Sequence, residues 1–372
     1  MASVSIHPPV PVSIENLRQA HPGLFLLSPD EPASLEDAMR KAGLLAADES
    51  VSHCSRAGEG NMNCTVRVKT DNRSFILKQS RPWVEKYPGL AAPWDRVCRE
   101  REFYGLVQGV EGVADRMPAV LHFDAGARCM ALEDLGEDGD YTDLFRGATL
   151  DAKELETVAT FLGRLHRMAW DQPGYRHENR EMRALNHAHV FEIPFRADNG
   201  LDLESVSTGL AVAGALVHQD VGLAKLAADL GREVYLADGP TLLHGDFFPG
   251  SLVRTSRGPY VIDPEFGFHG RAEFDVGVWL GHLVLAGQPE VLVDVWRPAY
   301  RGPTGFVDEL ALRLAGIEIV RRLIGYAQLP LGCTPRERIR RLEVGIGLMQ
   351  SPTWSTLREG LVDLRSREEQ PC

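Results

Sequence analysis

One stretch of this 372-residue sequence limits what the chain can fold into more than any other. It consists of two short apolar runs, residues 242–246 and 260–265, which each end in acidic residues and are separated by a turn rich in Gly and Pro. Such a pattern predicts two short strands that pair with each other, so that their polar ends lie together. The side chains gathered in this way would be Asp246, Ser251, Asp263 and Glu265.

These four side chains indicate a particular chemistry. One carboxylate can accept a proton from an attacking hydroxyl group. The other oxygens can hold Mg²⁺, which prefers hard oxygen ligands and keeps part of its water shell. Because positioning and charge neutralisation supply most of the catalysis in phosphoryl transfer, the stretch predicts a site for that reaction.

Composition narrows the class of protein. The chain is 44% hydrophobic and 25% charged with a formal net charge of -12, which is typical of a globular protein and unlike a protein that binds nucleic acid backbones. Its six cysteines form no C-x-x-C pair, and its first residues do not resemble a signal peptide. Since no apolar run is long enough to span a bilayer, we expect a cytoplasmic protein without membrane or nucleic acid partners.

The first part of the chain predicts an antiparallel meander with strands at residues 51–54, 64–69 and 74–78. The turn between the first two strands is rich in glycine, which lets backbone N–H groups approach a phosphate. An isolated G-x-G is nevertheless more often an ordinary hairpin turn. The glycines and asparagines of this turn are Gly58, Gly60, Asn61 and Asn63.

A lysine and a glutamate follow this turn. Lys78 lies near the end of the third strand, and a helix predicted over residues 96–107 places Glu100 beside its apolar stripe. Two interpretations stay open at this point. The two side chains form an ion pair near a nucleotide, with Glu102 as the alternative partner, or both are solvated surface charges.

A change of periodicity marks a domain boundary. The strand predicted over residues 128–135 contains Glu133 and Leu135 and runs into a glycine-rich crossing, so we divide the chain into domains 1–134 and 135–372. The second domain has helical periodicity, apart from the polar residues 171–205, which predict a loop or an insertion.

Two features of the second domain concern the stretch that contains Asp246 and Asp263. Asp275 precedes an apolar helix, so we expect it to cap that helix, with bracing of the Asp246 loop as the alternative. Arg321 and Arg322 are adjacent in a predicted helix and project in different directions, so at most one of them is expected to point straight into a pocket.

Together these motifs resemble the aminoglycoside phosphotransferase and choline kinase group of protein-kinase-like proteins. The resemblance covers about residues 35–350 and implies an α+β, two-lobed fold with a small antiparallel sheet lobe and a larger, mainly helical lobe. Within the group the chain is similar to the methylthioribose kinase branch, because Pro-Gly-Ser follows His-Gly-Asp, Asp-Pro-Glu replaces Asp-Phe-Gly, and Leu-Ile-Gly follows the arginine pair.

The resemblance also implies roles for these residues. Asp246 would be the catalytic base, and Arg321 and Arg322 would contact the substrate. The metal ligands would be Asp263 and Glu265, with Ser251 at the position of a magnesium-binding Asn. The residues around ATP would be Gly58, Gly60, Asn61, Asn63, Lys78 held by Glu100, and the backbone near Glu133 and Leu135.

We therefore expect an ATP- and Mg²⁺-dependent kinase that phosphorylates a hydroxyl group of a small polar metabolite, most simply a methylthioribose-like sugar. An alternative is an aminoglycoside, choline or homoserine phosphotransferase. A polycationic antibiotic would need an acidic cleft, for which the loops offer Glu137, Asp138, Asp140 and Asp143, whereas the arginine pair would repel it.

A third alternative is a catalytically silent nucleotide-binding protein, which conflicts with the presence of the base, the acidic metal positions and the lysine. Two segments depart from the methylthioribose kinase branch, namely Phe247-Phe248 and residues 180–210. A homodimer stays open as the assembly.

Overall fold

The computed structural model describes residues 13–58, 62–168 and 176–365. The chain divides into two compact units, which are described separately below. The small unit comprises Met1–Gln108 and Met117–Gly139, and the large unit comprises Gly109–Arg116 and Asp140–Cys372.

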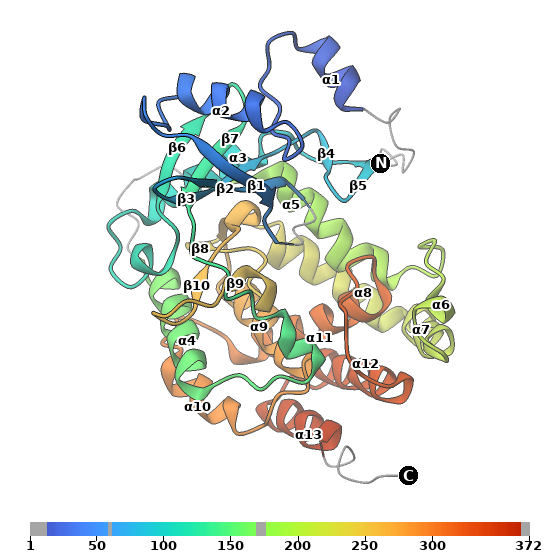
Figure 1. The fold of residues 1–372 in the computed structure, drawn as a ribbon. Coiled ribbons are helices and arrows are strands. Elements are labelled where there is room, and N and C mark those ends of the chain that lie inside the picture. Colours follow the sequence, from blue (N-terminus) through green and yellow to red (C-terminus); the bar gives the residue numbers. More distant parts are fainter. Residues whose placement is uncertain (1–12, 59–61, 169–175, 366–372) are drawn as a thin grey trace. The chain divides into compact units, whose positions relative to one another are not determined.

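The small unit is built on an antiparallel sheet with the strand order β1-β2-β3-β7-β6 (Figure 1). This arrangement confirms the strands predicted at residues 51–54, 64–69 and 74–78. The strands of the unit are β1 (Val51–Arg56), β2 (Cys64–Thr70), β3 (Ser74–Gln79), β4 (Trp83–Val84), β5 (Tyr87–Ala91), β6 (Val120–Asp124) and β7 (Cys129–Glu133). The α-helices of the unit are α1 (Ile14–Ala20), α2 (Pro32–Lys41) and α3 (Arg96–Val107).

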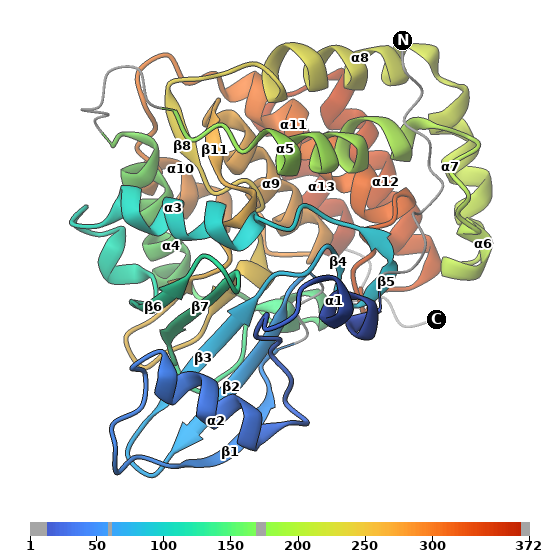
Figure 2. The same cartoon turned by 90° about the horizontal axis from the view of Figure 1, so that it is seen from above.

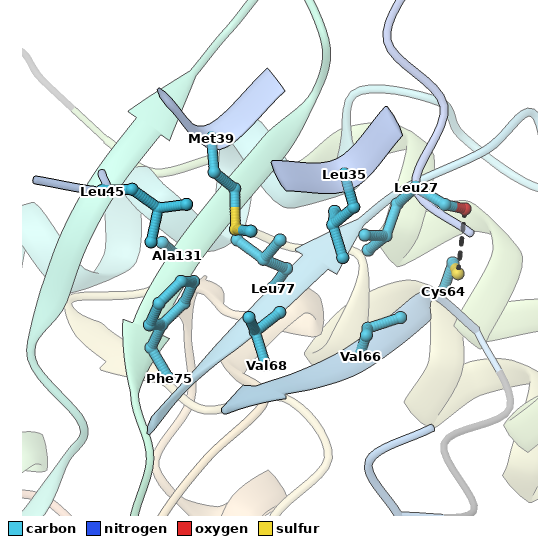
Figure 3. Close-up of a cluster of buried hydrophobic side chains, with 10 residues drawn as sticks. All are labelled: Leu27, Leu35, Met39, Leu45, Cys64, Val66, Val68, Phe75, Leu77 and Ala131. Atoms are coloured by element: carbon cyan, nitrogen blue, oxygen red, sulfur yellow. Dashed lines mark hydrogen bonds between the residues drawn. The ribbon is translucent and has the colours of Figure 1, made fainter. Parts of the chain in front are cut away.

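One face of this sheet carries the hydrophobic core of the small unit. Alternate residues of a strand point to the same face, and in β2 those are Cys64, Val66 and Val68, all fully buried. Figure 3 shows these side chains meeting Leu35 and Met39, which α2 contributes from above the sheet. The alternation places the side chain of Lys78 in β3 on the opposite face from its neighbour Leu77.

The large unit is mainly helical. Its α-helices are α4 (Ala152–His166), α5 (Arg180–His187), α6 (Leu203–Val206), α7 (Leu210–Gln219), α8 (Val221–Leu230), α9 (Glu273–Leu285), α10 (Leu292–Ala299), α11 (Asp308–Ile324), α12 (Pro335–Gln350) and α13 (Trp354–Arg365). Its short strands are β8 (Thr241–Leu243), β9 (Leu252–Val253), β10 (Tyr260–Val261) and β11 (Phe268–Gly270).

Helix α11 lies at the centre of this unit, between α9 and α12 (Figure 1, Figure 2). A helix that is buried on all sides packs closely against its neighbours, and glycines let the helix backbones approach each other. A Cβ atom at Gly281 of α9 would lie 2.9 Å from the backbone oxygen of Ala315, and one at Gly316 would lie 2.5 Å from the oxygen of Gly345 in α12. This packing fixes the position of α11, which carries both arginines of interest.

Two predictions about the large unit are wrong. The apolar runs around Leu242 and Tyr260 do not pair with each other, because β8 pairs with β11 and β9 pairs with β10. Of the two alternatives for residues 171–205, the loop is wrong, since the described part from residue 180 forms α5, a π-helical turn (Ala188–Glu192), a 3₁₀ turn (Ile193–Phe195) and α6. The alternative of an insertion stays a prediction.

Within the described residues, no single helix is long and apolar enough to cross a membrane, although the bent pair of Leu210–Gln219 and Val221–Tyr235 passes a test of length and composition alone.

Candidate active site

The loop that carries Asp246 is held by a buried carboxylate. Strand β8 ends at Leu243, and the backbone N–H groups of His244 and Gly245 then donate to Asp275 in the first turn of α9, over 2.7 and 2.9 Å. Gly245 has φ of 86°, and a Cβ atom there would lie 2.1 Å from the backbone oxygen of Phe266. Only glycine therefore fits the turn that presents Asp246.

Asp275 braces this loop rather than capping a helix, so the favoured prediction for this residue is wrong and the alternative is confirmed. His166 Nε2 also contacts the Asp275 carboxylate, at 3.2 Å, and Nδ1 of the same ring lies 2.8 Å from the hydroxyl of Tyr300. Burial and the nearby Asp275 raise the pKa of Tyr300, so its hydroxyl stays protonated and donates to Nδ1. The imidazole then donates its Nε2–H to Asp275.

Three further hydrogen bonds tie the Asp246 loop to the segment that carries Asp263. His244 Nε2 lies 2.9 Å from the carbonyl oxygen of Ile262, whose own N–H donates to the carbonyl oxygen of Ser251 over 2.9 Å. The Ser251 hydroxyl donates to the backbone oxygen of Asp246, also over 2.9 Å. The Ser251 hydroxyl therefore uses its hydrogen within the loop, and only its oxygen lone pairs remain for another partner.

The segment after β10 presents two carboxylates. Asp263 adopts a left-handed conformation with φ of 61°, which is rare and costs free energy for a residue other than glycine. Glu265 is buried in the 3₁₀ turn that follows. The side chain of Asn179 stabilises this turn by donating to the carbonyl oxygens of Glu265 and Gly267, over 2.8 and 2.9 Å.

Two arginines reach the carboxylate of Asp246. Arg322 donates from Nη2 to Oδ1 of Asp246 over 3.1 Å, and Nη1 of Arg321 lies 3.7 Å from the same oxygen. The prediction that at most one of them would point into the site is therefore wrong. Adjacent residues lie 100° apart around a helix. Their side chains can still converge if they are long and if both bind a residue that lies between them on the helix surface.

That residue is Glu318, three and four positions before the arginines. It accepts from Arg321 Nη1 over 3.0 Å and from Arg322 Nε over 2.6 Å, and His282 Nε2 lies 3.1 Å away. Burial opposes its ionisation, but Arg321, Arg322 and His282 hold the pKa of Glu318 well below its usual range. Burial lowers the pKa of His282 to about 4, so the imidazole is neutral and donates its Nε2–H to the carboxylate.

The two phenylalanines after Asp246 have different surroundings. Phe247 is fully buried and packs against Phe161, with ring centroids 6.1 Å apart, and against Trp279. Phe248 lies under the guanidinium group of Arg322, 4.8 Å from its ring centroid to Cζ. Phe247 is therefore part of the core, whereas Phe248 supports an arginine of the site.

In the small unit, Lys78 and Glu100 form a buried ion pair with 2.7 Å between Nζ and Oε2. The side chains are only 3% and 0% exposed, so the interpretation as solvated surface charges is wrong. The alternative partner Glu102 is bound instead by Arg99, its neighbour on α3. Asp95 precedes α3 but makes no side-chain cap, since its carboxylate accepts from Arg128.

The other predicted nucleotide residues lie in the same unit. Gly58 ends the described part of the turn after β1 with φ of 68°, and a Cβ atom there would meet nothing within 4 Å. Gly60 and Asn61 lie outside the described residues, and Asn63 is buried at the start of β2. Glu133 ends β7 and accepts from the backbone N–H of Ala119, while Leu135 is half-buried in the segment that follows.

Buried Arg96 organises the neighbourhood of this turn. Its Nη1 donates to the carbonyl oxygens of Arg81 and Pro93 over 2.6 and 2.9 Å, and its Nη2 donates to those of Met62 and Trp83. One guanidinium group thus links a residue of the glycine turn, Met62, to both ends of the segment between Trp83 and Trp94.

The sequence interpretation missed Glu318, His282 and Asn186 as members of the site. Asn186 accepts from Arg321 Nη2 over 3.3 Å and donates toward the carbonyl oxygen of Gly245, at 3.4 Å. The spacing Glu-x-x-Arg-Arg was the available signal for Glu318, because residues three and four apart share one face of a helix. His282 and Asn186 reach the site only through tertiary packing, which no local pattern records.

A small antiparallel sheet with a buried Lys–Glu pair and a helical unit with a braced His-Gly-Asp loop define a protein-kinase-like phosphotransferase. The model of the phosphotransferase enzyme family (APH) matches residues 53–305, and the chain belongs to this family. It is a small-molecule phosphotransferase, that is, a kinase. The choline kinase LicA from Streptococcus pneumoniae has the same fold, with a TM-score of 0.50 and 14% identity over 86% of this chain and 99% of that one.

Relatives of known name point to one branch of the family. The methylthioribose kinase of Exiguobacterium sibiricum is 25% identical over 341 residues, which cover 78% of this chain and 84% of the relative. The methylthioribose kinase of Bacillus pumilus is 25% identical over 355 residues, which cover 82% and 87%. The resemblance to this branch inferred from the motifs is thereby confirmed.

Proposed function

We propose that this chain is an ATP- and Mg²⁺-dependent kinase that transfers the γ-phosphoryl group to a hydroxyl group of a small, uncharged polar metabolite, with a methylthioribose-like sugar as the first candidate. The single observation that carries the proposal is the setting of Asp246. This carboxylate stands on a braced loop, is 20% exposed, and faces two buried arginines. The relatives named methylthioribose kinase support the choice of sugar.

Asp246 is proposed as the catalytic base. In the part of the chain that the structure describes, both arginine contacts go to Oδ1, so Oδ2 can accept the proton of the attacking hydroxyl group. The arginines hold the carboxylate in one orientation. The brace from Asp275 prevents the loop from turning away as the proton is transferred.

Asp263 and Glu265 are proposed to hold Mg²⁺. The described residues contain no cluster of three or more His, Cys, Asp and Glu side chains that could hold a metal by itself. Two carboxylates fit an ion that retains water and takes its remaining ligands from substrate phosphates. The strained backbone at Asp263 and the buried turn at Glu265 fix these oxygens. Ser251 would contribute only a lone pair, because its hydroxyl donates its hydrogen bond to the backbone oxygen of Asp246. When bound, Mg²⁺ would neutralise charge on the transferred phosphoryl group.

The small unit is proposed to bind the nucleotide. Lys78, oriented by Glu100, would contact the ATP phosphates, and the turn from Gly58 to Asn63 would cover them. Backbone groups near Glu133 and Leu135 would hydrogen-bond with adenine. We also propose that the enzyme acts in the cytoplasm.

The charges of the site favour an uncharged acceptor. Around Asp246 the two arginines are balanced by Asp246 and Glu318, and His282 is neutral. A polycationic antibiotic would meet two guanidinium groups here without surplus negative charge to bind it. Of the four acidic residues considered for such a ligand, two already form ion pairs, since Glu137 is bound by Lys69 and Asp143 by Arg254.

The direct test is an assay of ADP release with ATP, Mg²⁺ and a panel of acceptors: methylthioribose, other pentoses, choline, homoserine and aminoglycosides. We expect turnover with methylthioribose or a related sugar and none with the cationic compounds. ATP binding without ADP release for any acceptor would favour a silent nucleotide-binding protein. Turnover with an aminoglycoside alone would refute the proposed acceptor.

A further inference from the structure

Glu318 contacts both arginines that reach Asp246. It is 1% exposed and lies one helical turn before them on α11. Its Oε1 accepts from Arg322 Nε, and its Oε2 accepts from Arg321 Nη1, over 2.6 and 3.0 Å. Because three donors converge on one buried carboxylate when His282 is included, its position is fixed.

Arg322 turns the far side of its guanidinium group toward Asp246, whereas Arg321 approaches Asp246 with Nη1, the nitrogen that also donates to Glu318. Arg322 Nη2 binds Oδ1 of Asp246, and Arg321 Nη2 binds Asn186 beside the loop. Each guanidinium group is therefore held between two acceptors, with Glu318 behind it. A guanidinium group is planar, and its N–H bonds have fixed directions. When Glu318 binds one edge of the group, the directions of the remaining N–H donors are fixed as well.

We propose that Glu318 is a positioning residue, which orients Arg321 and Arg322 toward the phosphate acceptor; this inference rests on the proposed function. It does not touch the acceptor itself. Its contribution to the reaction passes through the two arginines, and its contribution to the fold is secondary, because α11 is already fixed by the glycine contacts with α9 and α12.

The first variant is Glu318→Gln, which keeps the size of the side chain and removes the charge. We expect it to raise the KM for the acceptor and to lower kcat, with a combined loss in kcat/KM of about 10- to 100-fold, the range expected for a hydrogen bond to a charged group. The KM for ATP should stay within about twofold. The control is Glu273→Gln in α9, which also removes a buried carboxylate that pairs with an arginine, Arg271, and should leave both KM values unchanged.

A second pair of variants separates positioning from a general loss of stability. If Glu318 acts through the arginines, Glu318→Gln should cost much less in an Arg322→Ala background than in the wild-type enzyme. Equal losses in both backgrounds would show that Glu318 acts independently of Arg322 and would overturn the proposal. Should Glu318→Gln fail to fold, Glu318→Asp keeps the charge, moves it back by one methylene, and should still raise the acceptor KM.

A chemical readout does not depend on knowing the acceptor. Phenylglyoxal modifies accessible guanidinium groups, and peptide mapping gives the rate at each arginine. We expect Arg321 and Arg322 to react at least about tenfold faster in Glu318→Gln than in the wild-type enzyme or Glu273→Gln, because a loss of about 1.4 kcal/mol of restraint corresponds to tenfold. Unchanged rates would refute the restraint even if the kinase activity is confirmed. Faster rates without turnover on any acceptor would support the restraint and place the failure in the proposed function.

Discussion

The brace at Asp275 gives a prediction whose size follows from the structure. The substitution is Asp275→Asn, which changes almost nothing in volume. The carboxylate accepts from three donors: the backbone N–H groups of His244 and Gly245, and the Nε2–H of His166. An amide has one acceptor oxygen, so its NH₂ group must face at least one of these donors.

The best arrangement keeps the amide oxygen at the Oδ2 position, where His244 and His166 still bind. The N–H group of Gly245 then loses its acceptor. Loss of a hydrogen bond to a charged group costs about 1.5–3 kcal/mol, and the buried N–H left without a partner adds about 1–3 kcal/mol. We therefore expect Asp275→Asn to lower the free energy of unfolding by about 2.5–6 kcal/mol.

The same change should move the loop that carries Asp246. A displacement of about 1 Å in a reacting group can cost about 100-fold in rate, so we expect kcat to fall by about that factor, with the KM for ATP unchanged. Urea unfolding and steady-state kinetics measure the two effects. The control is Asp294→Asn, which removes a similar charge from an exposed pair with Arg358 and should change neither quantity. If Asp275→Asn behaves like this control, the brace has no role in stability or catalysis.

Three further predictions concern the nucleotide pair, the loop glycine and acidity. Lys78→Met should weaken ATP binding in calorimetry and destabilise the small unit by about 3–5 kcal/mol, because Glu100 would keep a buried charge without this partner; unchanged ATP affinity would contradict the assigned role. Gly245→Ala should cost at least about 2 kcal/mol more than Gly147→Ala, since both have positive φ but only the former meets a backbone oxygen; equal unfolding midpoints would show that the loop can shift. His282 has a folded-state pKa of about 4, below its unfolded value, so the unfolded chain binds more protons and stability should fall by about 2 kcal/mol between pH 7 and pH 5; the same fall in His282→Gln would exclude this histidine as the cause.

Local patterns predicted much of this fold. Alternation of apolar residues predicted β1, β2 and β3, and the helix predicted over residues 96–107 coincides with α3. Lys78 and Glu100 could be proposed as partners because each lies on a regular element whose buried face the sequence reveals. Such features depend on residues that are close in sequence.

The errors share a different cause, which is contact between distant segments. Whether β8 pairs with β10 or β11 depends on the path of the chain after Phe266, which composition does not indicate. Asp275 had a local role available as a helix cap, but two N–H groups some 30 residues earlier bind it instead. The prediction for Arg321 and Arg322 used only the directions of their Cβ atoms. The positions of the guanidinium groups depend instead on the length of the side chains and on their hydrogen bonds to Glu318.

The central claim is that Asp246 accepts the proton of the acceptor hydroxyl group, and Asp246→Asn tests it most directly. The measurement is ADP release with the acceptor that the panel identifies, together with ATP affinity by calorimetry on the same protein. The account predicts that turnover falls by a factor of at least about 1,000, within the range that general base catalysis contributes, while ATP affinity stays within about twofold. Turnover close to that of the wild-type enzyme would contradict it.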